Sequence, residues 1–264
     1  MPAALVRKAV KLAAIPAGSA REAAGTDIVM LLYHRIGVGR REIDLERSAF
    51  ERQLQVLAAG NRGRTLDDAL VTGGVVVTFD DGTADFHEHA LPLLERYRVP
   101  ALLYLATGLV AGPGGWGSRP VGPNGEGSLA WSQVEEAVAG GFVSIGSHTH
   151  SHADLSRVDE GMAEEEMRRS KELIEDRVGH ACNHFAYPWA VASAAADRAA
   201  RRHFDSAALA WRTNRRGRLD PFTLGRLPVL RNDGPMFFQA KVSGRLDAEA
   251  IAYRLLRRGP WRRR

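Results

Sequence analysis

Two short stretches of this chain combine carboxylates and imidazoles at spacings suited to binding a metal ion. In the segment VVVTFDDGTADF, Asp80 and Asp81 follow an apolar, β-branched run and precede Gly82. Adjacent side chains at the end of a strand point in different directions, so one carboxylate can ligate a cation while its neighbour faces a substrate. An Asp-Asp-Gly turn with only a capping role is the alternative interpretation of these residues.

The second stretch, SIGSHTHSHADL, places His148, His150 and His152 after another apolar run. An H-x-x-x-H pair brings two imidazoles to one ion when the second lies on a helical turn. One carboxylate then completes a three-ligand site with an open position for a water or a substrate. In an extended segment His150 would point away from His148, so we expect His150 to lie outside the ligand set.

These motifs need a framework, and from Asp27 onward β-branched runs alternate with amphipathic helical patterns. The alternation predicts a parallel sheet or barrel built from β-α units. The predicted strands are Ile28–Tyr33, Val75–Phe79, Ala101–Ala106, Phe142–Gly146, His184–Tyr187, Ser206–Ala210 and Arg226–Val229. The predicted helices are Ser48–Ala59, Asp85–Tyr97, Ser132–Ala139, Glu160–Val178 and Ser193–His203. Because loops after parallel strands converge at one edge, we expect the residues that follow these strands to form the site.

Composition sets the broad class of protein. The chain has 264 residues, 45% of them hydrophobic and 25% charged, which suits a globular protein with one large domain. We expect that domain at 27–245, between basic tails at 1–26 and 246–264. The single cysteine, Cys182, excludes an intrachain disulfide.

The formal net charge of +5 is concentrated in the two tails. No nucleic-acid motif accompanies the basic residues, so nucleic acid is not an expected partner. We interpret the tails first as solvated, and second as a peripheral contact with an anionic membrane surface. No apolar run approaches the ~18 residues that a spanning helix needs, and we expect a cytoplasmic protein.

Three motifs in this order resemble the polysaccharide deacetylase family with its NodB homology domain. They are TFDDG at Thr78–Gly82, SHTHSH at Ser147–His152 and FAYPW at Phe185–Trp189. The segments LLYHRI at Leu31–Ile36 and HALPLL at His89–Leu94 are similar to that family as well. The first two motifs together are specific, whereas the third alone is weak.

The resemblance implies a distorted (β/α) barrel of about seven parallel strands and removal of N-acetyl groups from an amino-sugar polysaccharide or oligosaccharide. It implies a divalent metal, usually zinc, held by Asp81, His148 and His152. It makes Asp80 the general base. It also places the backbone amide of Tyr187 where it would help to hold the oxyanion.

The chain departs from the family pattern at the residue that orients the base. Many members carry an arginine two residues before the tyrosine, and Phe185 occupies that position here. Some members carry a compensating arginine elsewhere, and Arg226 in LGRLPV occurs at such a place. We expect Arg226 to hold Asp80, with a surface charge at a strand start as the alternative.

A second departure concerns the general acid. Many members supply it from a Leu-x-His motif near the end of the domain, but no histidine follows His203. We expect His34, which follows the first predicted strand, to reach the site and either protonate the leaving nitrogen or bind the substrate beside it. A structural His34, with the acid supplied by Asp233 or by a bound water, is the alternative.

Two other function classes fit part of the pattern. Two histidines and one carboxylate also form the facial triad of iron-dependent oxygenases, but those usually lie on jelly rolls and would leave Asp80 without a role. A catalytically degenerate carbohydrate-binding member of the family fits the missing Leu-x-His. The presence of both aspartates and of the two outer histidines argues against it.

Overall fold

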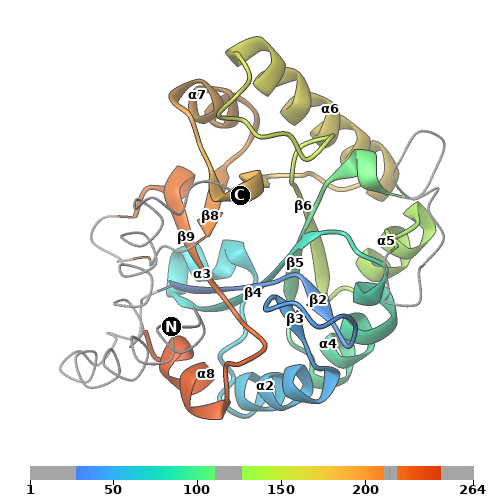
Figure 1. The fold of residues 1–264 in the computed structure, drawn as a ribbon, viewed down its shortest axis with the longest axis vertical. Helices are drawn as coiled ribbons and strands as arrows, with labels where there is room; N and C mark the ends of the chain where they lie inside the picture. The colour runs from blue at the N-terminus through green and yellow to red at the C-terminus, as the bar shows by residue number, and fades with distance from the viewer. Residues whose placement is uncertain (1–27, 111–126, 211–213, 215–218, 245–264) are drawn as a thin grey trace.

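The computed structural model describes residues 28–110, 127–210, 214 and 219–244, which are coloured in Figure 1. The predicted tails at 1–26 and 246–264 and the segment 111–126 lie outside the described residues. The expectations for membrane contact through the tails therefore stay predictions. Among the described helices, none has the length and apolar character needed to cross a membrane.

Seven parallel strands form a closed barrel, as predicted (Figure 1). Their order around the barrel follows the chain, and β9 pairs with β1 to close it. The strands are β1 (Ile28–Tyr33), β4 (Gly74–Asp81), β5 (Ala101–Leu105), β6 (Val143–Ser147), β7 (His184–Ala186), β8 (Ser206–Ala210) and β9 (Leu224–Pro228). All of their carboxyl ends therefore lie at one rim of the barrel, which is where the motif residues are found.

Successive side chains of each strand alternate between the inside of the barrel and the layer under the helices. Leu31, Val77 and Phe79 belong to the large cluster that packs against the helices. Met30 and Val76 belong to a smaller cluster with residues of β1, β4, β5, β7, β8 and β9, which fills the barrel. Because both faces of the strands are buried, these segments are apolar runs rather than alternating patterns.

An outer layer of helices surrounds the barrel (Figure 1). These are α2 (Arg47–Ala59), α4 (Leu91–Tyr97) after a π-helical turn (Phe86–Ala90), α5 (Trp131–Ala139), α6 (Glu160–Val178), α7 (Ala194–His203) and α8 (Pro235–Val242). Helix α3 (Leu66–Thr72) adds Leu66 and Ala69 to the inner cluster and lies at the amino ends of the strands. Helices α3 and α8 and the strands β2 (Arg35–Ile36) and β3 (Asp44–Leu45) lie outside the predicted elements. The two strands have only two residues each, too few to show a periodicity.

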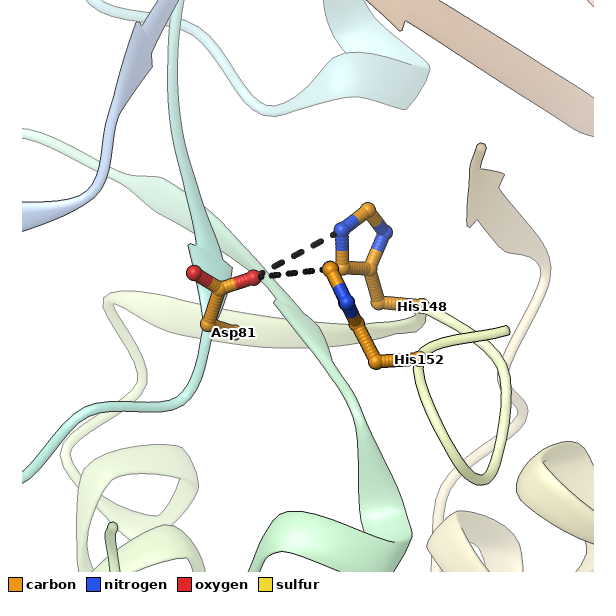
Figure 2. A group of neighbouring side chains, drawn as sticks. All are labelled: Asp81, His148 and His152. Carbon is orange, nitrogen blue, oxygen red and sulfur yellow. Dashed lines mark ion pairs between the residues drawn. The ribbon is translucent and has the colours of Figure 1, made fainter. Parts of the chain in front are cut away.

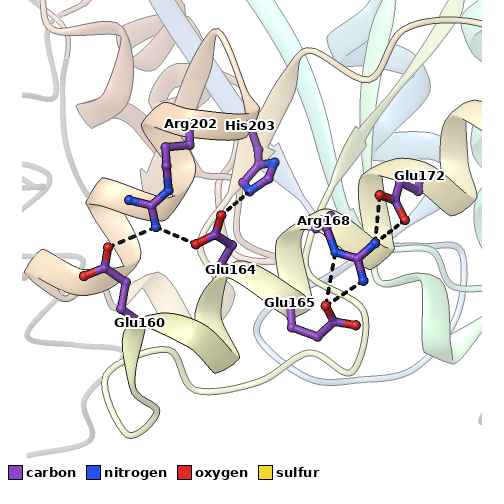
Figure 3. A network of polar contacts seen from close by, with 7 residues as sticks. All are labelled: Glu160, Glu164, Glu165, Arg168, Glu172, Arg202 and His203. Carbon is purple, nitrogen blue, oxygen red and sulfur yellow. Dashed lines mark hydrogen bonds and ion pairs between the residues drawn. The ribbon is translucent and has the colours of Figure 1, made fainter.

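Charged side chains join α6 to α7 across the outside of the barrel (Figure 3). Arg202 of α7 contacts Glu160 at 2.9 Å and Glu164 at 2.7 Å, and Nε2 of His203 lies 3.2 Å from Glu164. Exposed pairs of this kind contribute only about 0–1 kcal/mol each. Together with the buried apolar face of α6 they hold this helix at one place beside β6 and β7.

Candidate active site

Asp80 and Asp81 are the last two residues of β4, so the strand runs two residues beyond its predicted end at Phe79. Asp80 keeps the strand alternation and is 4% exposed. Asp81 has a φ of 75°, a left-handed conformation that non-glycine residues seldom adopt. Such a conformation costs roughly 1–3 kcal/mol and must be held by the surroundings. In this conformation of Asp81, the carboxylates of Asp80 and Asp81 both lie 3.7 Å from Nε2 of His148.

Asp81, His148 and His152 converge at the rim of the barrel (Figure 2). Oδ1 of Asp81 lies 3.7 Å from Nε2 of His148 and 3.3 Å from Nε2 of His152. One ligand atom from each residue lies within 4.8 Å of the other two. Ligands bound tetrahedrally to zinc at their usual distances are roughly 3.3–3.6 Å apart. The two distances from Asp81 are close to this range, so the three residues could hold a zinc-sized divalent ion.

The tautomer of His148 is set by the neighbouring strand. Its Nδ1 lies 2.7 Å from the carbonyl oxygen of Ala186 and donates to it, which leaves the Nε2 lone pair facing Asp81. Burial lowers the pKa of His148 more than the nearby carboxylates raise it, so the imidazole stays neutral. A neutral imidazole whose second nitrogen is held by a carbonyl is the usual arrangement of a metal-binding histidine.

His152 is approached from the side by Trp189. The indole Nε1 of Trp189 donates to the His152 carbonyl at 3.3 Å, and the two rings meet edge to face at 4.8 Å. The Trp189 side chain is nevertheless exposed at the rim, with 60% of its surface accessible. His150 lies outside the ligand set, as expected, because its Nδ1 is 2.9 Å from Oγ1 of Thr107.

Arg226 of β9 reaches Asp80 inside the barrel. Its Nη1 and Nη2 lie 2.5 Å and 2.8 Å from the two carboxylate oxygens, and its guanidinium stacks 5.0 Å over the Tyr104 ring. Burial would raise the pKa of Asp80, but the guanidinium, together with His148 and His34, outweighs burial and holds that pKa below its usual range. Phe185, at the position of the family arginine, instead packs outward, stacked on Phe204 at 5.1 Å.

His34 lies between β1 and β2 at the same rim and is half-buried. Burial opposes ionisation of Asp80 and Asp81, and the imidazole of His34 is among the groups that lower the pKa of both carboxyls. His34 is thus a neighbour of the two aspartates. The alternative acid, Asp233, is buried and engaged elsewhere: Lys241 Nζ lies 2.5 Å from its Oδ2, which also accepts from the Leu230 amide at 2.9 Å.

The amide expected to hold the oxyanion is not available. The N–H of Tyr187 donates to the carbonyl of Ala208 at 3.1 Å, which continues the ladder between β7 and β8. Two residues later, the N–H of Trp189 has no hydrogen-bond partner among the described residues, and Trp189 has a φ of 58°. The sequence signal for Trp189 was its place directly after Pro188 at a strand end, but no pattern indicates which of two neighbouring amides the ladder uses.

The fold and the site together define a (β/α) barrel with a candidate metal site at its rim, and comparison with known proteins gives its family. The sequence profile of the polysaccharide deacetylase family matches residues 70–204, about half of the chain. The chain therefore belongs to the polysaccharide deacetylase family, as its motifs indicated. In that family the substrates are N-acetylated polysaccharides.

A comparison with individual proteins finds relatives of low sequence identity. The putative polysaccharide deacetylase YxkH of Bacillus subtilis is 27% identical over 114 residues, which are 43% of this chain and 36% of that protein. The match thus spans little more than a third of YxkH.

Three solved structures resemble the barrel. A polysaccharide deacetylase from Bacillus cereus has a TM-score of 0.71 at 22% identity, over 82% of this chain and 69% of that one. The Streptococcus pyogenes deacetylase PplD, solved with acetate, has a TM-score of 0.71 at 22% identity, over 82% and 98%. IcaB from Ammonifex degensii has a TM-score of 0.66 at 25% identity, over 84% and 97%.

Proposed function

We propose that this protein is a metal-dependent hydrolase that removes N-acetyl groups from an amino-sugar polysaccharide or oligosaccharide. The observation that carries the proposal is the convergence of Asp81, His148 and His152 beside a buried, arginine-held Asp80. The one-carboxylate, two-imidazole donor set suits zinc, with an open position left for substrate. A divalent ion bound there would polarise the acetamide carbonyl and activate a water molecule.

Asp80 is the general base in this proposal. It accepts a proton from the water whose oxygen forms the new bond to the carbonyl carbon. Arg226 uses one lone pair on each carboxylate oxygen, so both oxygens keep a further acceptor position. The lowered pKa of Asp80, which Arg226 maintains against burial, keeps the carboxyl ionised and able to accept that proton.

Two further residues complete the reaction. The free N–H of Trp189 replaces that of Tyr187 as the backbone donor toward the developing oxyanion. His34 gives a proton to the sugar nitrogen as the carbon–nitrogen bond breaks, so acetate and a free amine leave. His34 suits this role because an imidazole can donate a proton and because it lies at the same rim, within electrostatic range of both aspartates.

The direct test is acetate release from N-acetylglucosamine oligomers by purified protein, with and without added zinc. We expect release that stops on chelation, returns with zinc and is lost in Asp80→Asn. Oligomer binding without acetate release in the zinc-loaded protein would instead identify a non-catalytic carbohydrate-binding member. Oxygen consumption with ferrous iron, in place of acetate release, would identify an oxygenase, although a parallel barrel is not the usual oxygenase fold.

A further inference from the structure

The loop that carries both histidine ligands has an unusual backbone. Thr149 and His152 have φ values of 67° and 60°, in the left-handed region. A β-branched residue such as threonine rarely adopts this conformation, and each such residue costs roughly 1–3 kcal/mol. Contacts outside the loop must therefore hold it in place.

Helix α6 supplies two of these contacts. Ser151 donates twice to Glu166, from its backbone N–H to Oε2 at 2.7 Å and from its hydroxyl to Oε1 at 2.8 Å. Ser147 donates from its hydroxyl to that of Ser170 at 2.9 Å, and both serines are fully buried. The bonds to Glu166 are charge-assisted, whereas the bond between Ser147 and Ser170 is shielded from water, so both can act as anchors.

The spacing of the anchors matches the spacing of the ligands. Glu166 and Ser170 are four residues apart on α6 and so lie on one face, a single turn from each other. Their partners, Ser147 and Ser151, are also four residues apart, and each immediately precedes a histidine ligand. One face of α6 thus contacts the end of β6 just before His148 and the loop just before His152.

Two other faces of α6 are also in contact with neighbouring parts of the protein. Its apolar face buries Ala163, Met167 and Ile174 against the barrel layer. The face of α6 that carries Glu164 is joined to α7 through the contacts of Arg202 and His203 (Figure 3). A helix held in this way can fix the position of a loop that is strained on its own.

We infer that α6 pre-organises the two histidine ligands, and that Glu166 is the positioning residue that sets the affinity of the site for a divalent metal. This inference rests on the proposed metal site. Without Glu166 the Ser151 N–H loses its acceptor, and the loop can leave the left-handed conformation that directs His152 toward Asp81. Loss of a partner that bonds a ligand directly typically weakens metal binding about 10–100-fold, and Glu166 bonds the residue before the ligand, so we expect an effect near the lower end of that range.

The test is zinc affinity of the metal-free protein, measured by competition with a chromophoric chelator. We expect Glu166→Ala to bind zinc about tenfold more weakly than the unaltered protein. Glu166→Gln, which keeps one acceptor oxygen, should fall between the two. Glu165→Ala is the matched control, because Glu165 is on the same helix but pairs with Arg168 on its outer side (Figure 3) and should bind zinc like the unaltered protein.

Equal zinc affinity in Glu166→Ala and the unaltered protein would overturn the role of Glu166 and leave the proposed function standing. An equal loss in Glu165→Ala would also overturn it, since the effect would then belong to the helix surface. An unaltered protein that does not bind zinc would overturn the metal site and this inference together. If Glu166→Ala does not fold, Glu166→Gln decides, and zinc affinity equal to that of the unaltered protein would reject the role.

Discussion

Arg226 and Asp80 form a two-pronged ion pair inside the barrel although 146 residues separate them in the chain. Their strands, β9 and β4, are the two neighbours of β1, so closure of the barrel brings the guanidinium to the carboxyl end of β4. We propose that this pair orients Asp80, the role that the family resemblance would give to an arginine at the position of Phe185.

We expect Arg226→Met to destabilise the protein by about 3–5 kcal/mol at neutral pH, because it leaves a buried carboxylate unpaired. The lowered pKa of Asp80 means that the pair stabilises the fold at pH above the ordinary aspartate range, and that this contribution is lost as pH falls through the lowered pKa. In Arg226→Met burial dominates and the pKa of Asp80 rises. Urea denaturation at neutral and acid pH should therefore show a deficit that shrinks as the pH is lowered.

The control for this prediction is the double variant Arg226→Met with Asp80→Asn, which removes the unpaired charge and should recover part of the lost stability. In the single variant the acid limb of the pH–rate profile should also move to higher pH. A single variant as stable as the unaltered protein at neutral pH would show that the pair does not hold Asp80.

We expect His148→Ala and His152→Ala to lower metal content from one divalent ion per chain, since each removes one of three ligands. Elemental analysis of protein purified with limiting zinc measures this. His150→Ala serves as the control, because its ring contacts Thr107 and should leave occupancy unchanged. Full occupancy in both ligand variants would refute the assigned site.

Asp80→Asn should keep the metal and lose activity by about a hundredfold to ten-thousandfold, the usual effect of removing a general base. Asp81→Asn should lose both metal and activity, because only Asp81 is assigned to the ion. Metal content and acetate release, measured on the same preparations, separate the two roles. Normal turnover in Asp80→Asn would mean that another group is the base.

His34→Gln should lower turnover without releasing metal, because His34 lies within electrostatic range of the aspartates but is not in the ligand set. As the acid, His34 must be protonated to act, so its loss should remove or shift the alkaline limb of the pH–rate profile. The profile of the variant, recorded with zinc content, tests this. An unchanged rate and profile would make His34 structural and leave a bound water as the acid, since Asp233 is paired with Lys241.

The sequence by itself determined the strand and helix order, the family and the residue types of the site. Buried parallel strands are continuous apolar runs, and the motif residues directly follow or end them, so the local pattern carries this information. The predicted bounds of β1, β8 and α6 agree with the structure residue for residue. Elements of a few residues, such as β2 and β3, have too little periodicity to be predicted.

Only the tertiary structure decided how the site is assembled. The left-handed backbone at Asp81 and His152 depends on surrounding contacts rather than on residue type. The Tyr187 amide is bonded to Ala208 and is not free at the rim, because β8 continues beside the chain after β7 ends. The support of the histidine loop by Glu166 likewise depends on packing between segments distant in the chain, which no local pattern encodes.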